Sequence, residues 1–352
     1  MENDANRRLS KCTDGMHRSN FCVGAVSVQV VGKCHDDVAL VPSLLPFSVE
    51  TDTSEINIRV EWMSALERTS GRQLFDSDST WRLCECEEGL QFDFAAPVFG
   101  DRIYKRLLVD DHFTKAILQM SEECFADFPS PAAFLEYPVD ELLIMHRLTQ
   151  EPAIELHGAG IVRVNGEGNL FVGHSGAGKS TTTRLWTDRE DVEVLSDDRI
   201  IVRPDEVGRH AADELGTPIR PADALDKVGI LRLRDCSTSR TNHFAQDDKA
   251  KSLGMRMYGT PWHGEAMFAS PNSAPLQRIF VLEHGHGNVL TRLTRSQMVA
   301  ELFARSFVPF HRHEYVESAL SFLEQLADSV PCYRYSFEPD QRSVDKILHF
   351  HD

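Results

Sequence analysis

The chain has 352 residues, a formal net charge of −17 and 41% hydrophobic residues. This length allows two domains, or one large domain with an appendage, around a substantial core. The negative charge argues against a nucleic-acid groove, because phosphate backbones recruit basic surfaces. No apolar run approaches a membrane span, and the polar N-terminus lacks the apolar core of a signal peptide. We therefore expect neither a nucleic-acid partner nor a membrane association.

The eight cysteines are scattered through a chain that is large enough to fold without disulfides. We therefore expect free thiols and a cytoplasmic location. Cys84 and Cys86 are two residues apart in a strand-like stretch, so both side chains would face the same side of the strand. For this pair we favour packing over metal binding.

The first third of the chain indicates an arm followed by a small domain. Residues 1–22 are polar and charged without periodicity, which favours a disordered arm. Residues 23–137 are expected to form a smaller β-rich or α+β domain. Its strand-like stretches lie at 23–31, 56–62, 81–85 and 90–94, with a hairpin turn over 87–89. The sequence leaves open whether this domain contacts a substrate or packs against a partner.

The remaining residues, 138–352, are expected to form the nucleotide-binding domain. Pro138 suits the first position of a helix over 138–149, whose apolar face we expect to pack the nucleotide core. An Asn-Gly turn then separates two apolar segments, 154–164 and 170–172, which is a strong hairpin signal. Scaffold elements follow near the C-terminus, namely helices over 297–307 and 315–327, a strand over 332–337 and a last helix capped by Ser343.

A phosphate-binding loop is predicted at residues 173–181, Gly-His-Ser-Gly-Ala-Gly-Lys-Ser-Thr. Glycine lets the main chain curl closely enough to point backbone N–H groups at phosphate oxygens. An apolar strand precedes the loop and a helix follows it, so the helix directs its positive end at the anion. Lys179 would contact the β- and γ-phosphates, and Ser180 would hold Mg²⁺. The predicted nucleotide contacts are Gly173, Ser175, Gly176, Ala177, Gly178, Lys179, Ser180 and Thr181.

Two adjacent acids, Asp197 and Asp198, follow a short strand at 192–195 and precede another at 199–202. Acids at a strand end beside a phosphate loop are where a nucleotide-bound Mg²⁺ finds its carboxylate. One acid can organise the metal while the other accepts the proton of an attacking hydroxyl. The sequence leaves open which aspartate takes which role.

The order of these motifs resembles the HPr kinase/phosphorylase superfamily, whose nucleotide fold is shared with ATP-dependent phosphoenolpyruvate carboxykinase. The resemblance rests on His157 ahead of a hairpin, the phosphate loop, and Leu-Ser-Asp-Asp soon after it. It is closer to a divergent bacterial branch that includes serine kinases of lasso-peptide precursors. The stretches 258–265, 273–276 and 279–283 support this branch, and the similarity covers about residues 138–350.

The resemblance implies an α/β fold, with a phosphoenolpyruvate carboxykinase-like or HPr kinase-like P-loop core on a mixed β-sheet. It implies ATP and Mg²⁺ as cofactors, and transfer of the γ-phosphate to a serine (or similar) hydroxyl of a peptide or protein. Its catalytic residues would be Asp197, Asp198, His157 and Lys179, and its metal ligands Ser180, Asp198 and Glu265. The family's Glu-x-x-Arg-Gly signature is not evident, so neither HPr as the substrate nor the phosphorylase reaction is carried over.

Other interpretations stay open. The chain could instead be a small-metabolite kinase, or a regulatory nucleotide-binding ATPase without an acceptor. The sequence identifies neither the acceptor nor the donor nucleotide, and it leaves the oligomeric state open, a homo-oligomer included. His263 could reach the substrate or shape the wall of the site, and for His174 we favour a variable loop position over a phosphate contact. Exposed loop is favoured over a lid or a metal site for Lys249, Lys251, His284, His286, His311 and His313.

Overall fold

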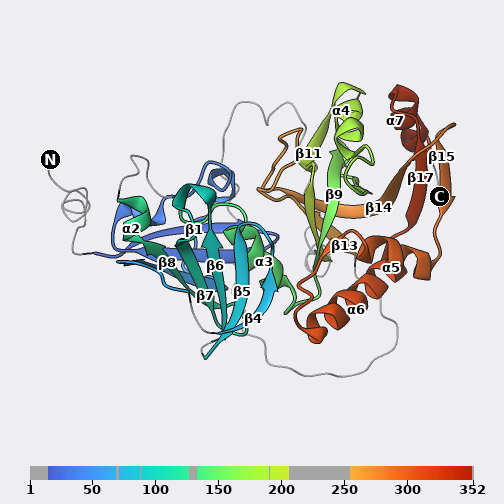
Figure 1. Cartoon of the computed structure of the whole chain (residues 1–352). Helices are drawn as coiled ribbons and strands as arrows, with labels where there is room; N and C mark the ends of the chain where they lie inside the picture. The colour runs from blue at the N-terminus through green and yellow to red at the C-terminus, as the bar shows by residue number, and fades with distance from the viewer. Residues whose placement is uncertain are drawn as a thin grey trace, which may run out of the picture.

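The computed structural model describes residues 15–68, 71–87, 89–126, 133–189, 191–205 and 254–350. In these ranges the chain is a mixed α/β protein with two mixed β-sheets and few helices (Figure 1). Lys249 and Lys251, the candidate lid residues, lie outside these ranges.

The first sheet has the strand order β1-β2-β3-β8-β7-β6-β5-β4. β3 pairs in parallel with both β2 and β8, and the other neighbours are antiparallel. Its strands are β1 (His17–Val23), β2 (Val26–Gly32), β3 (Ile56–Met63), β4 (Arg72–Asp76), β5 (Trp81–Cys86), β6 (Gly89–Ala95), β7 (Ile103–Val109) and β8 (Lys115–Ser121).

The second sheet has the order β10-β9-β12-β13-β14-β17-β15, with β11 and β16 paired to β9 and β10 also paired in parallel to β14. Its strands are β9 (Ile154–Arg163), β10 (Gly168–Val172), β11 (Val192–Ser196), β12 (Arg199–Pro204), β13 (Met255–Tyr258), β14 (Ser273–His284), β15 (Val289–Arg292), β16 (Ser306–Phe307) and β17 (Cys332–Phe337).

The helices lie beside and between the two sheets. α4 and α7 pack together at one end of the second sheet, and α5 packs on α6 (Figure 1). The α-helices are α2 (Glu122–Phe125), α3 (Val139–Leu148), α4 (Lys179–Arg189), α5 (Arg295–Phe303), α6 (His313–Ser329) and α7 (Gln341–Leu348), and short 3₁₀ helices cover His35–Val38, Leu45–Phe47 and Pro97–Phe99. No helix in the described ranges is long and apolar enough to cross a membrane.

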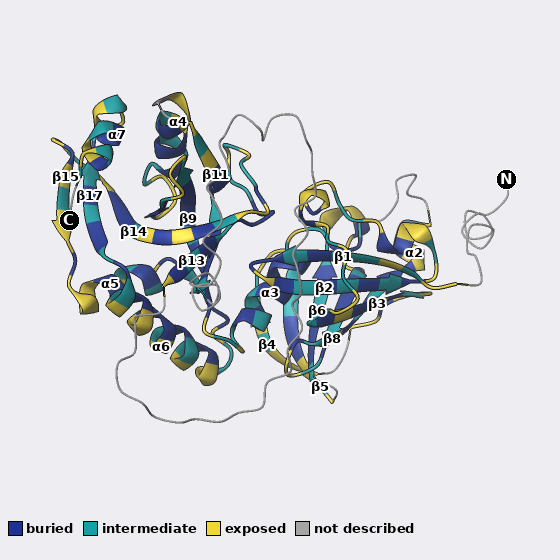
Figure 2. Cartoon of the chain, turned by 180° about the vertical axis from the view of Figure 1, so that it is seen from behind, coloured by how far each residue is buried: buried dark blue, intermediate teal, exposed yellow. Residues whose placement is uncertain are grey.

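The side-chain alternation of β10 explains why the second sheet is covered on both faces. Leu170 and Val172 face one hydrophobic cluster, with α5 and α6, while Phe171 faces the other, with Trp186 of α4. Every residue of β10 is therefore buried, and β9 and β17 are also largely buried (Figure 2). The loop that leaves β10 thus starts from a fixed point in the core.

Several predicted elements are confirmed. β5 and β6 form the expected hairpin, and β9 and β10 form the second one. The chain start differs from the prediction: His17–Val23 is a strand, where we expected an arm up to residue 22 and one strand over 23–31. β1 and β2 are joined by Gly24 and Ala25, whose φ angles are 58° and 62°. Alanine is uncommon in such a turn, so no hairpin signal is present at these two residues.

Further corrections concern helix ends, helix packing and cysteines. α5 ends at Phe303 and a short strand follows, whereas we expected one helix to residue 307. Asp340, not Ser343, caps α7, because its side chain accepts from the Arg342 N–H. The apolar face of α3 belongs to the core of the first sheet rather than to the nucleotide core.

Cys34 is disulfide-bonded, so the expectation that all cysteines are free thiols is wrong. The cytoplasmic location stays a prediction.

A buried histidine makes the fold sensitive to acid. His146 on α3 is 1% exposed, and its Nδ1 donates to the Leu142 carbonyl oxygen at 2.6 Å. The rings of Phe113 and His311 lie 4.9 and 5.3 Å from its ring centre. Burial lowers the pKa of His146 to about 3, so the folded protein keeps this ring neutral over a range in which the unfolded chain protonates it.

We expect the free energy of unfolding to fall as the pH drops from about 6.5 to about 3, by up to roughly 1.4 kcal/mol per pH unit from His146. The sign follows because the unfolded state binds more protons in this window. His146→Phe should flatten this part of the dependence, measured by urea unfolding at several pH values. His286→Phe, at a fully exposed ring, is the matched control. An unchanged pH dependence in the His146 variant would contradict the prediction.

Candidate functional site

The predicted phosphate-binding loop connects β10 to α4, as the sequence indicates. β10 ends at Val172, Gly173 follows directly, and α4 begins at Lys179. The preceding strand β9 runs antiparallel to β10, with Leu170 opposite Gly160. The strand, loop and helix order that a phosphate site requires is therefore present.

Three of the loop glycines have conformations or surroundings that other residues would not tolerate. Gly176 and Gly178 have φ angles of 78° and 101°, in the region that favours glycine. A Cβ at Gly178 would lie 2.4 Å from Cζ of Phe337. At Gly173 a Cβ would lie 2.7 Å from the Cβ of Ala177. The loop is thus curled so tightly that glycine is required at positions the motif assigns to it.

A histidine and an aromatic residue support the predicted phosphate-binding loop. His284, at the end of β14, donates from Nε2 to the Gly176 carbonyl oxygen at 2.7 Å. Its ring stacks on Phe337 with centres 5.9 Å apart. We expected exposed loop at His284 and His311. His284 is exposed but lies at the end of β14, whereas His311 lies in a turn and is half-buried, with its ring against His146.

Lys179 lies inside the loop rather than in solvent. Its Nζ donates to the carbonyl oxygens of Gly173 and His174 at 3.1 and 3.2 Å, and the residue is 7% exposed. Burial lowers the pKa of Lys179; Asp198 opposes this shift and Arg199 adds to it. The ammonium group is therefore held at the centre of the loop with an acid nearby.

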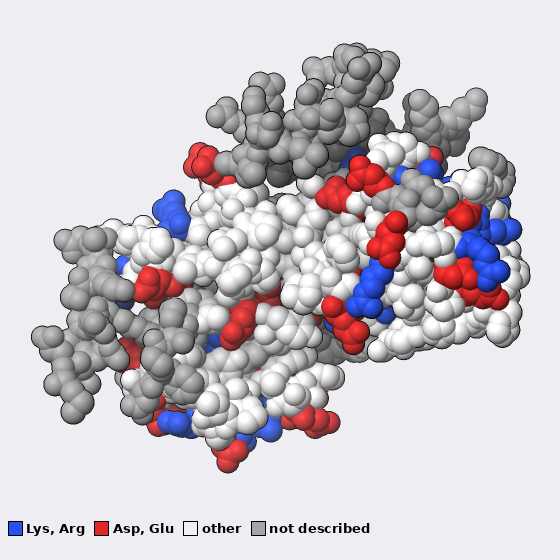
Figure 3. All heavy atoms as spheres, turned by 90° about the horizontal axis from the view of Figure 1, so that it is seen from above, with Lys and Arg blue, Asp and Glu red and all other residues white. Residues whose placement is uncertain are grey.

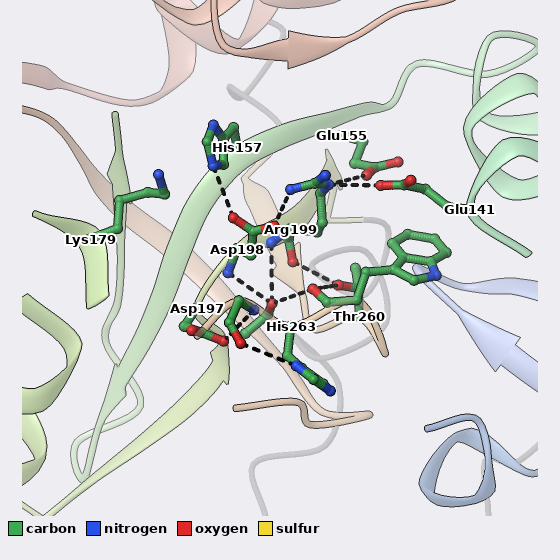
Figure 4. A network of polar contacts seen from close by, with 12 residues as sticks. Glu141, Glu155, His157, Lys179, Asp197, Asp198, Arg199, Thr260 and His263 are labelled. Carbon is green, nitrogen blue, oxygen red and sulfur yellow. Dashed lines mark hydrogen bonds and ion pairs between the residues drawn. The ribbon is translucent and has the colours of Figure 1, made fainter. Parts of the chain in front are cut away.

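Asp198 and His157 form a hydrogen-bonded pair facing Lys179. Asp198 Oδ1 lies 2.9 Å from His157 Nε2, and its Oδ2 is ion-paired with Arg199 (Figure 4). Burial alone would raise the pKa of Asp198, but the hydrogen bond to His157 and the charges of Arg199 and Lys179 outweigh it and hold the pKa below its ordinary value. Asp198 is thus a carboxylate at neutral pH.

Backbone pairing sets the position of this aspartate–histidine pair. Arg199 is opposite His157 in the antiparallel pairing of β12 with β9, and the Gly158 N–H donates to the Asp198 carbonyl oxygen at 3.0 Å. The Ser196 hydroxyl oxygen accepts from the N–H groups of Asp198 and Arg199. The turn between β11 and β12 is therefore fixed by hydrogen bonds before its acidic side chains are considered.

Asp197 points away from Asp198 and holds a neighbouring loop. Its carboxylate accepts from the backbone N–H groups of Gly264, Ala266 and Phe268 at 2.9, 2.8 and 3.2 Å. The residue is 1% exposed. The paired acids thus have different surroundings: one carboxylate is occupied by three backbone donors, and the other faces the histidine and the lysine.

The side chains of the other predicted site residues lie outside this hydrogen-bonded group in the described ranges. Glu265 lies in the loop that Asp197 holds, and its side chain is exposed. It makes no ion pair within the described part of the chain. His263 lies in the same loop, with Nδ1 3.2 Å from the Gly264 carbonyl oxygen. Ser180 is half-buried in the first turn of α4, while His174 is exposed.

A buried charged group that we did not predict lies behind Asp198. Arg199 Nε donates to Glu141 Oε1 at 2.7 Å, and Glu155 lies 3.6 Å away (Figure 4). Burial, followed by the neighbouring charge of Glu141, raises the pKa of Glu155 well above its ordinary value. A signal was available: Glu155 lies two residues before His157, so both side chains point to the same side of β9.

Within the described ranges, no group of three or more His, Cys, Asp or Glu residues is arranged to hold a metal ion. On the face shown in Figure 3, acidic and basic side chains are interspersed with neutral ones. Among known proteins, the chain matches no family model and no curated protein.

The burial of Asp197 predicts a structural role that can be measured. We expect Asp197→Asn to lower the free energy of unfolding by about 3 kcal/mol, because an amide NH₂ would face a backbone N–H and leave buried donors unpaired. Chemical denaturation of the two single variants gives the comparison. Asp198→Asn, at the more exposed neighbour, should cost clearly less. Equal losses in the two variants would contradict this division between the acids.

Proposed function

We propose that this protein is an ATP-dependent phosphotransferase that moves the γ-phosphate of Mg·ATP to a serine (or similar) hydroxyl of a peptide or protein. One observation carries the proposal. A glycine-built loop with a buried lysine lies beside a hydrogen-bonded aspartate–histidine pair, and these groups come from α4, β9 and the β11–β12 turn. A phosphate cradle beside an ionised carboxylate is what phosphoryl transfer to a hydroxyl requires.

The loop residues fit a triphosphate. The space at Gly173 and Gly178 is too small for a Cβ, so the backbone itself forms the lining that phosphate oxygens would contact. Lys179 places one positive charge in this lining, and the N-terminus of α4 adds a partial positive charge. Ser180 and Asp198 would hold Mg²⁺, with Glu265 as a further candidate, and the metal would neutralise charge on the phosphates.

The surroundings of the two acids support Asp198 as the proton acceptor. Asp197 has its carboxylate occupied by three backbone donors, whereas Asp198 is an ionised carboxylate beside His157. Asp198 would accept the proton of the substrate hydroxyl as its oxygen attacks phosphorus. His157 orients that carboxylate, and Lys179 stabilises the charge of the phosphate that is transferred.

Lys179→Ala should abolish phosphoryl transfer, because the loop loses its only side-chain cation for the phosphates. The measurement is transfer of label from γ-labelled Mg·ATP, with nucleotide affinity measured in parallel. Lys346→Ala, at an exposed lysine of α7, should leave transfer unchanged. Normal transfer by the Lys179 variant would remove the basis of the assignment.

Asp198→Asn should retain nucleotide binding and lose transfer by about 10²-fold or more, because an amide cannot accept the hydroxyl proton. Mg·ATP binding by calorimetry, beside the transfer rate, separates the two roles of this residue. If the variant loses nucleotide affinity in proportion to its activity, Asp198 acts chiefly as a metal ligand.

The acceptor class is tested with γ-labelled Mg·ATP, the purified protein and a size-fractionated extract of its host. The proposal expects label on serine in the peptide or protein fraction. Label confined to the small-molecule fraction would make the protein a metabolite kinase. Label released only as free phosphate would indicate a nucleotide-hydrolysing switch without an acceptor.

A further inference from the structure

Helix α3 joins the first sheet to the candidate site. Its apolar residues lie in the core of the first sheet, whereas the two acids in its first turn point toward the second sheet. Asp140 and Glu141 are only 2% and 7% exposed. The apolar residues of α3 in the first core are Val139, Leu142, Leu143, Ile144 and Leu148.

Glu141 reaches the paired acids through Arg199. The guanidinium donates from Nε to Glu141 Oε1 at 2.7 Å and from Nη1 to Asp198 Oδ2. Its plane lies against the ring of Phe307, with Cζ 4.0 Å from the ring centre. A planar guanidinium held at both edges and on one face has a fixed orientation, so it transmits the position of one carboxylate to the other.

A third acid reinforces this orientation. Glu155 lies 3.6 Å from the Arg199 guanidinium, and neither of its carboxyl oxygens has a hydrogen-bond partner among the described residues. Glu141 and Glu155 therefore lie at the Nε edge of Arg199, and Asp198 binds its Nη1. Without the hydrogen bond to Glu141, the guanidinium would be drawn toward Glu155 and Asp198 alone, and the geometry of the Asp198 contact would change.

The neighbouring acid of α3 makes a second contact with the site. Asp140 Oδ2 accepts from Trp262 Nε1 at 2.9 Å, and the Trp262 carbonyl oxygen accepts from the Ser196 hydroxyl. Trp262 precedes the loop segment that Asp197 holds. Two adjacent residues of one helix turn thus contact the surroundings of two adjacent aspartates.

We propose that Glu141 is a positioning residue: through Arg199 it fixes the carboxylate of Asp198, so the packing of α3 in the N-terminal domain controls phosphoryl transfer. This inference rests on the proposed function. It gives the N-terminal domain a part in the reaction. Displacement of α3 moves the proton acceptor away from its aligned position while the phosphate loop stays intact.

The junction between the two sheets contains a matched ion pair that does not touch the site. Arg203 on β12 pairs with Glu151 and also donates to the Gly24 carbonyl oxygen at 2.8 Å. Arg147 on α3 pairs with both Glu151 and Glu55. Glu151→Gln therefore weakens the same junction as Glu141→Gln without altering a partner of Asp198.

The experiment compares Glu141→Gln with Glu151→Gln in the full-length protein. We expect Glu141→Gln to lower the transfer rate by about 10- to 100-fold, a range typical of small misplacements at a reacting centre, with the Mg·ATP dissociation constant changed less than about twofold. Glu151→Gln should keep the transfer rate within about threefold of the parent. Equal losses of activity in the two variants would overturn the proposal, because the effect would then be general loosening of the junction.

A second readout does not depend on any catalytic activity. The side-chain NMR signal of His157, which contacts Asp198, should shift in Glu141→Gln and stay in place in Glu151→Gln. An unmoved signal in both variants overturns the inference even if the parent transfers phosphate. If the parent transfers no phosphate and the signal still shifts, the proposed function fails while the link from α3 to Asp198 stands.

Arg199→Lys provides a further variant in case Glu141→Gln folds poorly. Lysine keeps the positive charge among the acids but cannot hold two carboxylates at fixed angles. It should shift the His157 signal and lower transfer as Glu141→Gln does. Adding Glu141→Gln to Arg199→Lys should cause little further loss, since both act through one contact. Fully additive losses would show that Glu141 acts by another route and would overturn the proposal.

Discussion

The site depends on the opposite directions taken by two neighbouring carboxylates at the end of β11. The loop at 264–268 binds the Asp197 carboxylate, whereas His157 and Arg199 bind that of Asp198, so the turn directs its two acids to different partners. Asp197 is buried and satisfied by three backbone N–H groups, which fixes the loop that carries Trp262 and Glu265. Asp198 is then the acid that faces His157 and Lys179. One acid forms the wall of the site and the other supplies its reactive group.

A buried group of charged residues behind this turn contains more acids than cations. Glu141 and Glu155 lie beside Arg199 at the junction of the sheets, and Asp140, next to Glu141 in the chain, binds Trp262. Burial raises the pKa of Asp140 to about 7 and that of Glu155 well above its ordinary value. Part of the group is therefore protonated near neutral pH, which lowers the desolvation cost of burying so many acids. A core built this way specifies geometry around Arg199 more than it adds stability.

The local parts of this structure could be predicted from the sequence, whereas the contacts between distant segments could not. The loop at 173–181 and the β9–β10 hairpin follow from glycine, turn and apolar patterns that span a few residues. The contact of Glu141 with Arg199 joins residues 58 positions apart and leaves no local pattern. β7 was missed because Lys105 and Arg106 interrupt its apolar alternation, although both are buried and bound to partners at a distance. Buried charges hide strands from pattern analysis for this reason.

The core against which α3 packs is likewise set by contacts between distant segments, and our prediction of it was wrong. Its helical apolar face is evident in the sequence, but an amphipathic pattern states only that a face is buried, not against which partner. The polar residues carry that information: Asp140 and Glu141 are buried and yet point at Trp262 and Arg199 of the second sheet. A helix whose apolar face belongs to one sheet and whose buried acids bind the other must move with both. Any rearrangement of the N-terminal sheet that shifts α3 therefore reaches the turn that carries Asp198.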